Sequence, residues 1–323
     1  MNHPLRDWLE YAGLSAAAWL VAQLEFRTLR PLADLIGSAV YFLDPRGRRT
    51  ALQNIEAAFP GKFALARKSW IARGSYRTFA RTMLELLWAP NMSEQFVRDH
   101  VVFEGWEYDA CGKNPEKSVI YCCMHFSNFE WLSLVGAYSF MRGPVIAQNF
   151  KNPLLGPIFN RLRASTGNTV IPQERAMIKM FKHLQSGGQF GMLIDLNLAP
   201  EEGAVPITCF NNLIACVTPA HVALAQRTGA AIVPVECRPL PDGRYLVIHH
   251  APIECPPEAD PAPLVQKCWN ALEPGIQARP ECWLWPYKHW RYKPRQDNAC
   301  YPAYANCSTR FDELLKAHAS AGA

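Results

Sequence analysis

The chain has 323 residues, of which 49% are hydrophobic and 19% are charged, and its formal net charge is +5. This composition is typical of a folded protein with a sizeable core, and the length allows one large or two small domains. The excess of positive charge is too small to indicate a nucleic-acid-binding protein, and the sequence contains no DNA- or RNA-binding motif, so we expect no nucleic-acid partner.

The N-terminal region is apolar enough to suggest contact with a membrane. Residues 11–24 form an uncharged, mostly apolar run between Glu10 and Glu25, and a second apolar stretch covers residues 35–43. The first run is shorter than the ~20 residues needed to span a bilayer, and Asp7 and Glu10 argue against a cleaved signal peptide. We therefore predict a membrane-associating helical segment over residues 1–45. The alternative is the N-terminal helical hairpin of a soluble protein.

The next part of the chain predicts helices first and then an alternation of strands and helices. Apolar residues recur at helical spacing over residues 64–87. From about residue 101, β-branched runs suggest strands over 119–123, 144–147, 169–171, 190–194, 231–235 and 245–248. Helical patterns lie between them at 131–140, 154–165, 175–185 and 219–228. This alternation predicts an α/β fold, a mixed sheet flanked by helices, over residues 46–295. Residues 296–323 are expected to form a peripheral tail with a short helix near 311–317.

The most informative segment is His125-Phe126-Ser127-Asn128-Phe129-Glu130, directly after the apolar run 119–124. The run predicts a buried strand, and the residues from Phe129 predict a helix. Residues five apart do not share a face of a regular helix, so His125 and Glu130 can meet only if a turn separates them. Glu130 would then accept a hydrogen bond from one imidazole nitrogen. The other nitrogen would be left to take a proton, as in many transferases and hydrolases.

The same residues have a purely structural interpretation. Ser127 and Glu130 form the pattern S-x-x-E ahead of an apolar helix, which is a capping box. Glu130 would then only cap the helix, and His125 would be an ordinary turn residue. These six residues alone leave both interpretations open.

Other catalytic and metal-binding motifs are absent from the sequence. There is no G-x-S-x-G, no H-E-x-x-H and neither glycine-rich nucleotide fingerprint. The 11 cysteines are scattered and include no C-x-x-C, so we expect free thiols in a reducing compartment and neither a disulfide framework nor a zinc site. Any catalysis is therefore expected to depend on His125 and Glu130, without a metal or a nucleotide.

Several segments resemble the blocks of glycerolipid and lipid A acyltransferases, in the order of that family, over residues of about 50 to 295. The segment HFSNFE resembles the H-x4-[DE] block. The later blocks are Asn152-Pro153, Asn160 to Arg163 with Gly167 to Ile171, Leu193-Ile194-Asp195, Gly203 to Pro206 with Thr218-Pro219-Ala220, and Pro280 to Trp285 with Trp290-Arg291. The most similar branch is that of the late acyltransferases of lipid A synthesis. The sequence departs from the pattern at Ser127, where glycine is usual, and at Asn197, where a second acidic residue is often found.

The resemblance implies a glycerolipid-acyltransferase-like fold and a set of site residues. His125 would be the catalytic base and Glu130 its partner, while Arg163, Asp195 and Asn128 would bind the substrates. Arg161 is the alternative to Arg163, which we prefer for its R-x-x-x-G spacing to Gly167. No metal is implied.

The resemblance also implies the reaction and its location. The chain would move a fatty acyl group from an acyl carrier thioester, with acyl-ACP or acyl-CoA as the co-substrate, to a hydroxyl of a lipid A precursor. No further cofactor is expected. The enzyme would act on the cytoplasmic face of the bacterial inner membrane, as a peripheral protein or with a single N-terminal anchor. The alternatives are another lysolipid or glycolipid acceptor, a thioesterase or lipid hydrolase, and a non-catalytic lipid-binding relative. Two basic clusters are candidates to meet acyl carrier protein or lipid phosphates: Arg46, Arg48 and Arg49, and Lys288, Arg291, Lys293 and Arg295.

Overall fold

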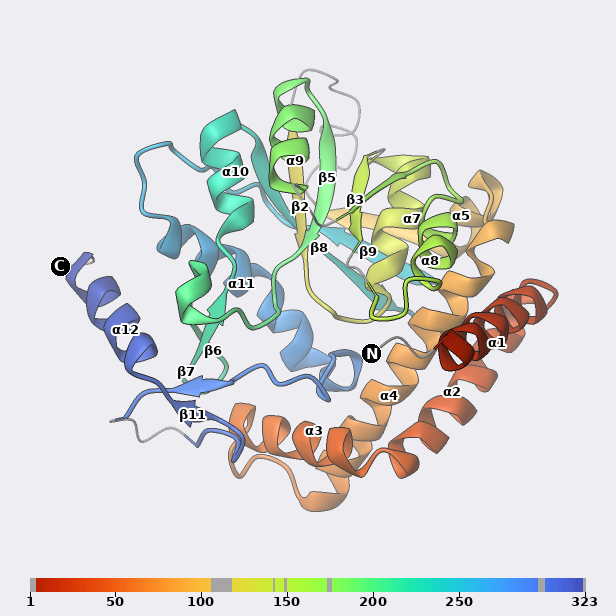
Figure 1. Ribbon diagram of the computed structural model, residues 1–323, viewed down its shortest axis with the longest axis horizontal. Coiled ribbons are helices and arrows are strands. Elements are labelled where there is room, and N and C mark those ends of the chain that lie inside the picture. Colours follow the sequence, from red (N-terminus) through yellow and green to blue (C-terminus); the bar gives the residue numbers. More distant parts are fainter. Residues whose placement is uncertain are drawn as a thin grey trace.

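A central five-stranded sheet organises the molecule (Figure 1). The computed structural model describes residues 4–105, 118–141, 143–147, 150–172, 176–295 and 300–321. The sheet has the order β1-β9-β8-β2-β5. Its strands are β1 (Val101–Gly105), β2 (Val119–Cys123), β5 (Gln189–Leu193), β8 (Ala231–Pro239) and β9 (Tyr245–His249). Neighbours are parallel except β8 and β9, so the predicted mixed α/β sheet is confirmed.

The remaining elements surround this sheet. The helices are α1 (Pro4–Ala22), α2 (Phe26–Leu43), α3 (Pro45–Ala58), α4 (Leu65–Trp88), α5 (Glu94–His100), α7 (Phe129–Ser139), α8 (Gly156–Arg163), α9 (Ala176–Gln185), α10 (Ala220–Thr228), α11 (Pro261–Ala278) and α12 (Thr309–Ala321), with the short 3-10 helices η1 (Ala89–Asn91), η2 (Pro200–Glu202) and η3 (Pro280–Cys282). Among the described residues there are also three two-stranded pairs: β3 (Pro144–Ala147) with β4 (Thr169–Pro172), β6 (Val205–Cys209) with β7 (Leu213–Val217), and β10 (Tyr292–Lys293) with β11 (Asn306–Cys307).

Strand β2 lies in the middle of the core because both of its faces are covered. All five of its residues are buried, and successive side chains of a strand point to opposite faces of the sheet. Ile120 and Cys122 pack with buried residues of α9, α10 and α11 on one face. Val119, Tyr121 and Cys123 pack with residues of α4, α7 and α8 on the other. The residues that follow β2 are therefore held between two packed layers.

Most predicted elements are present, and the exceptions have physical reasons. The predicted helix over 64–87 is α4, and all six predicted strands are formed. The sequence pattern missed β1, the β6–β7 hairpin and α11. Helix α11 contains Pro261, Pro263 and Pro274, and prolines are typical of loops. Pro261 is tolerated because it stands at the start of the helix, where its missing N–H has no partner to lose, and Asp260 caps that end.

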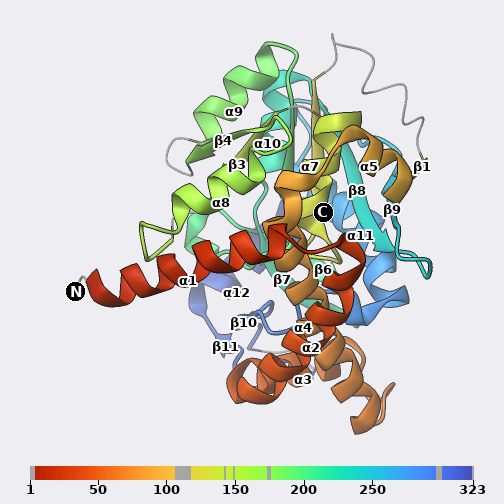
Figure 2. The ribbon, with the colours of Figure 1, turned by 90° about the vertical axis from the view of Figure 1, so that its right-hand side faces the viewer.

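The two N-terminal helices pack against α4 (Figure 2). They leave several large apolar side chains exposed. The exposed large apolar residues of α1 and α2 are Leu5, Trp8, Leu9, Tyr11, Trp19, Leu20, Leu35, Ile36, Val40, Phe42 and Leu43. Within the described part of the chain, every helix is either too short or too polar to cross a bilayer. At the other end of the chain, Phe311 of α12 is fully buried against Ala204 and Cys216.

Candidate active site

Two strand ends bring the site together. Strands β2 and β5 are parallel neighbours, with Cys123 opposite Leu193. Their carboxyl ends therefore lie at the same edge of the sheet, where α/β proteins commonly bind ligands. His125 follows β2 by two residues, and Asp195 follows β5 by two residues. Strand order thus places these two side chains next to each other.

His125 is hydrogen-bonded to Asp195 and not to Glu130. Its Nδ1 atom lies 2.7 Å from Oδ1 of Asp195, and its backbone N–H donates to Oδ2 over 2.9 Å. The indole N–H of Trp283 also donates to Oδ2, over 2.8 Å. Because an ionised carboxylate only accepts hydrogen bonds, the Nδ1 atom carries the proton and Nε2 has a free lone pair.

Asp195 is ionised in this arrangement. Its side chain is completely buried, and burial by itself favours the neutral acid. The neighbouring imidazole of His125, together with the hydrogen bonds from His125 and Trp283, outweighs burial and holds the pKa of Asp195 below its usual range. The His125 side chain is 12% exposed, so it reaches solvent while its partner does not.

The prediction that Glu130 is hydrogen-bonded to His125 is wrong. Both oxygens of Glu130 face the guanidinium of Arg163: Nε donates to Oε2 over 3.0 Å and Nη2 donates to Oε1 over 2.6 Å. Glu130 lies in the first turn of α7, and its side chain points to the end of α8. Asp195 approaches His125 from the neighbouring strand. Only 7% of the Glu130 side chain and 17% of the Arg163 side chain are exposed, so this is a largely buried bidentate pair.

The two candidate arginines differ in their contacts. Arg163 ends α8 and binds Glu130, whereas Arg161 lies on the exposed side of the same helix. The structure therefore brings Arg163 into contact with another candidate residue, at the start of α7.

The predicted capping box is not formed. The N-cap of α7 is Asn128, whose Oδ1 atom accepts from the backbone N–H of Trp131 over 3.2 Å. Ser127 precedes the cap and has a φ of 51°, in the left-handed region that favours glycine. A glycine at this position would adopt the conformation without strain.

The buried side chain of Asn128 links the turn to helix α4. The side chain is 1% exposed, and its Nδ2 atom donates to a carboxylate oxygen of Glu85 in α4. Both ends of the amide are therefore occupied by the protein itself. The prediction that Asn128 binds substrate has no support in this geometry, because the side chain points into the core.

Several residues of the site were not predicted from the sequence. Trp283 lies in the P-E-x-W segment, and His289 stacks on its ring with a centroid distance of 3.8 Å. Burial lowers the pKa of His289 to about 4, so this imidazole is neutral at pH 7. Glu85 and Thr82 of α4 also contact the turn. Glu85 is the one polar residue of the segment 83–88, whereas Thr82 follows Arg81 and gives no such signal.

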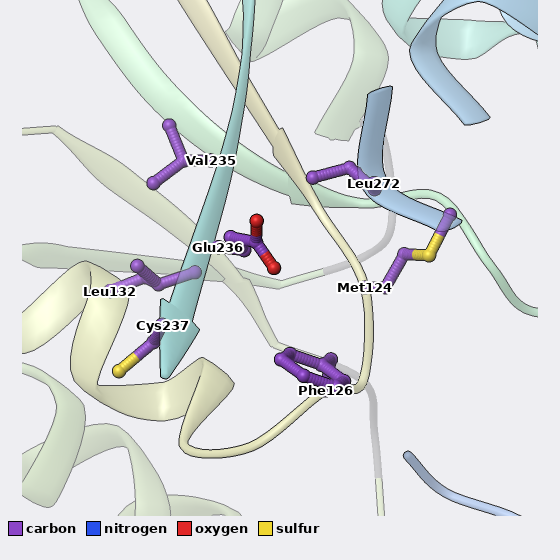
Figure 3. Close-up of a pocket in the computed structure, with 7 residues that line it drawn as sticks. All are labelled: Met124, Phe126, Leu132, Val235, Glu236, Cys237 and Leu272. Carbon is purple, nitrogen blue, oxygen red and sulfur yellow. The ribbon is translucent and has the colours of Figure 1, made fainter. Parts of the chain in front are cut away.

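A small cavity lies beside the turn between β2 and α7 (Figure 3). Its volume is about 10 Å³, which is room for roughly one water molecule. Figure 3 shows the carboxylate of Glu236 among the apolar side chains that line it, which include Phe126 and Leu132. A fatty acyl chain does not fit this space, so it is not the acyl-binding site.

The chain is similar to known acyltransferases over nearly its whole length. The pattern of the family described as bacterial lipid A biosynthesis acyltransferase matches residues 2–292. A lipid A biosynthesis lauroyltransferase of Escherichia coli (strain K12) is 24% identical over 299 residues, which cover 90% of this chain and 94% of that protein.

The matched range covers the strand end that carries His125, the helix end that carries Arg163 and the segment that carries Trp283. The chain therefore belongs to the bacterial lipid A biosynthesis acyltransferase family, and it is an acyltransferase.

Proposed function

We propose that this enzyme transfers a fatty acyl chain from an acyl carrier thioester to a hydroxyl of a lipid A precursor, with His125 as the general base. The observation that carries the proposal is the hydrogen bond between Nδ1 of His125 and the buried, ionised Asp195. It fixes the tautomer in which Nε2 accepts a proton. The acceptor class comes from the family, in which the similar lauroyltransferase acts in lipid A biosynthesis.

The reaction needs no covalent acyl-enzyme. Nε2 of His125 takes the proton of the acceptor hydroxyl as its oxygen attacks the thioester carbonyl. A C–O bond forms, the tetrahedral intermediate collapses, and the C–S bond breaks. The imidazolium then returns its proton to the leaving thiolate. Asp195 stabilises the imidazolium, and a positioned base of this kind contributes on the order of 10²–10⁴-fold to the rate.

Glu130 and Arg163 are proposed to act as a unit on the opposite side of the turn. The bidentate contact with Glu130 fixes the plane of the guanidinium. Arg163 is the candidate donor to the negative oxygen of the tetrahedral intermediate, since a fixed cation stabilises charge that develops in the transition state. Glu130 would then act on the reaction through Arg163.

An open groove of about 470 Å³ is our candidate surface for acyl carrier protein. It is lined by residues of α3 and α4 that are mostly basic or polar: Pro45, Arg48, Arg49, Leu52, Gln53, Glu56 and Lys68. Lys68 is paired with Glu56, while Arg48 lies over the ring of Tyr41. The excess of positive charge suits an acidic protein that carries the acyl donor.

The exposed apolar residues of α1 and α2 support attachment to a membrane surface, and the cytoplasmic face of the inner membrane is proposed from the family. Amphipathic helices can lie in the interface of a bilayer, where nearby arginines meet anionic headgroups. Arg27 and Arg30 of α2 are exposed beside this apolar surface. This arrangement would bring the site to a lipid acceptor.

The test is acyl transfer by the full chain from acyl carrier protein to a tetra-acylated lipid A precursor. We expect transfer by the wild type, loss of at least about 100-fold in His125→Ala, and no change in His318→Ala, which alters a histidine of α12. Release of free fatty acid without transfer would indicate a hydrolase, and transfer only to another lysolipid would replace the acceptor. Binding without turnover would indicate a lipid-binding relative. Full activity of His125→Ala would refute the mechanism.

A further inference from the structure

One face of α4 carries a row of polar side chains that contact the segments around Trp283 and Ser127. Ser75, Thr78, Thr82 and Glu85 are spaced by three, four and three residues, so they share one side of the helix. Ser75, Thr82 and Glu85 are buried. Helices α4 and α7 are in contact, and Figure 1 shows α4 passing beside the segment that joins β2 to α7.

The first half of this row holds the segment that carries Trp283. The Ser75 hydroxyl donates to the carbonyl oxygen of Trp283 and accepts from the backbone N–H of Trp285 over 3.1 Å. Thr78 donates to the carbonyl oxygen of Glu281 over 3.2 Å. This segment in turn supplies the indole N–H that binds Asp195.

The second half of the row holds the turn from His125 to Asn128, called the catalytic turn below. The Thr82 hydroxyl lies 3.0 Å from the carbonyl oxygen of Ser127 and 3.1 Å from the carbonyl oxygen of Thr78 in its own helix, so it shares its proton between them. The N–H of Ser127 donates to the carbonyl oxygen of Cys282 over 2.7 Å. Both polar backbone groups of Ser127 are therefore held by neighbouring segments.

Ser127 needs this support because its backbone is strained. A left-handed conformation is unfavourable for a non-glycine residue, and it persists only where the surroundings enforce it. If the turn relaxed, the start of α7 and the preceding His125 would move together.

Glu85 fixes the residue after Ser127. Its carboxylate is 2% exposed and accepts hydrogen bonds from Nδ2 of Asn128 and from the hydroxyl of Tyr245. The contact orients the amide of Asn128 so that its oxygen caps α7. A buried carboxylate is costly to fold around, and the bonds that it accepts here all serve to hold neighbouring segments in place.

We infer that Thr82 and Glu85 are positioning residues for acyl transfer: neither touches the substrate, and together they hold the left-handed Ser127–Asn128 turn that sets the position of His125. The inference deepens the proposed function and rests on His125 being its base. It assigns a role in the reaction to the face of a helix that lies outside the catalytic turn.

The experiment measures kcat, KM and melting temperature for Thr82→Val, Thr82→Ser and Glu85→Gln in the full chain. We expect Thr82→Val and Glu85→Gln to lower kcat about tenfold with KM changed less than about twofold, because a small displacement of a catalytic group lowers the rate steeply. Thr82→Ser keeps the hydroxyl and should restore kcat to within about twofold of the wild type.

Two matched controls separate positioning from general stability. Thr228→Val removes a threonine hydroxyl that bonds to a carbonyl of its own helix, α10, and should leave kcat unchanged. Tyr245→Phe removes a second hydrogen-bond donor to Glu85 but keeps the hydrogen bond between Glu85 and Asn128. It should lower the melting temperature without lowering kcat.

A double-variant cycle compares the effect of Thr82→Val on kcat in two backgrounds. A purely structural role of Thr82 would give the same effect in both. Glycine adopts the left-handed conformation without strain. In the Ser127→Gly background, Thr82→Val should therefore lower kcat less than about threefold, against about tenfold in the wild-type background. The same loss in both backgrounds would overturn the inference, as would unchanged kcat in folded Thr82→Val and Glu85→Gln. Failure of the proposed function is distinguishable, since it requires an inactive wild type or an active His125→Ala.

Discussion

The Nδ1 atom of His125 and the Oδ1 atom of Asp195 lie 2.7 Å apart, although 70 residues separate them along the chain. Three donors converge on this one carboxylate: the imidazole and backbone N–H groups of His125 and the indole N–H of Trp283. The carboxylate therefore fixes both the tautomer of the histidine and the position of its backbone.

Asp195→Asn should reduce acyl transfer by about 10²–10⁴-fold, because an amide cannot accept from all three donors. Whichever way the amide is turned, its NH₂ group faces an N–H. The measurement is kcat/KM for transfer to the lipid acceptor. Asp242→Asn is the matched control, since Asp242 is half-exposed and pairs only with Arg244 in the structure described. Equal activity of the two variants would contradict the assigned role of Asp195.

Glu130→Gln tests whether Glu130 acts on His125 directly or through Arg163. The variant breaks the bidentate pair, so we expect kcat to fall, and breaking a buried pair can cost 3–5 kcal/mol of stability in proteins generally. The pH at which the rate rises to half its maximum should stay unchanged, because Asp195 still binds Nδ1 of His125. The measurement is the pH–rate profile of Glu130→Gln beside that of Asp195→Asn. A clear shift in Glu130→Gln would restore a direct partnership between Glu130 and His125.

The sequence predicted the members of the site better than their pairing. The H-x4-E spacing favoured Glu130 as the partner of His125 because the two residues are close along the chain. The actual partner depends on β2 and β5 being neighbours in the sheet, and no local pattern contains strand order. Arg163 was predicted in the site, but its contact with Glu130 depends on how α8 packs against α7.

Local sequence patterns also predicted the fold only in part. Periodicity predicted the buried strands and the long helix α4, since these elements have continuous patterns. It did not predict α11, where the prolines at 261, 263 and 274 suggest a loop. The roles of Thr82 and Glu85 could not be predicted either. A polar residue in a helix is usually exposed, and only packing shows that these two face the catalytic turn.

Glu85 should make the stability of the protein depend on pH near neutrality. Burial raises the pKa of Glu85 to about 7 from 4.5, against the opposing effects of Arg81 and of the hydrogen bonds from Tyr245 and Asn128. The folded state therefore favours the neutral acid. The resulting stabilisation is full below pH 4.5 and is lost as the pH rises through 7.

The measurement is the free energy of unfolding by urea between pH 4.5 and 7.5 for the wild type and Glu85→Gln. The wild type should lose about 3 kcal/mol more than the variant over this range, because one pKa unit corresponds to about 1.4 kcal/mol. Changes from other titrating groups cancel in the difference. Parallel curves for the two proteins would show that Glu85 titrates at its ordinary pKa.

Removing exposed apolar groups from α1 should weaken binding to membranes. Trp19 is 65% exposed and Leu20 57% exposed, and an aspartate at either position would have to enter the lipid interface. Ile178 of α9 is also 57% exposed, but α9 lies far from α1 and α2 in both views of the molecule (Figures 1 and 2). The measurement is flotation with vesicles that contain anionic lipid. Trp19→Asp with Leu20→Asp should abolish flotation, while Ile178→Asp should float like the wild type. Equal flotation of all three proteins would mean that the apolar surface of α1 faces something other than lipid.

Weakening of wild-type flotation by salt would assign part of the binding to exposed cations such as Arg27 and Arg30, because salt screens attraction to anionic headgroups and leaves apolar contacts intact.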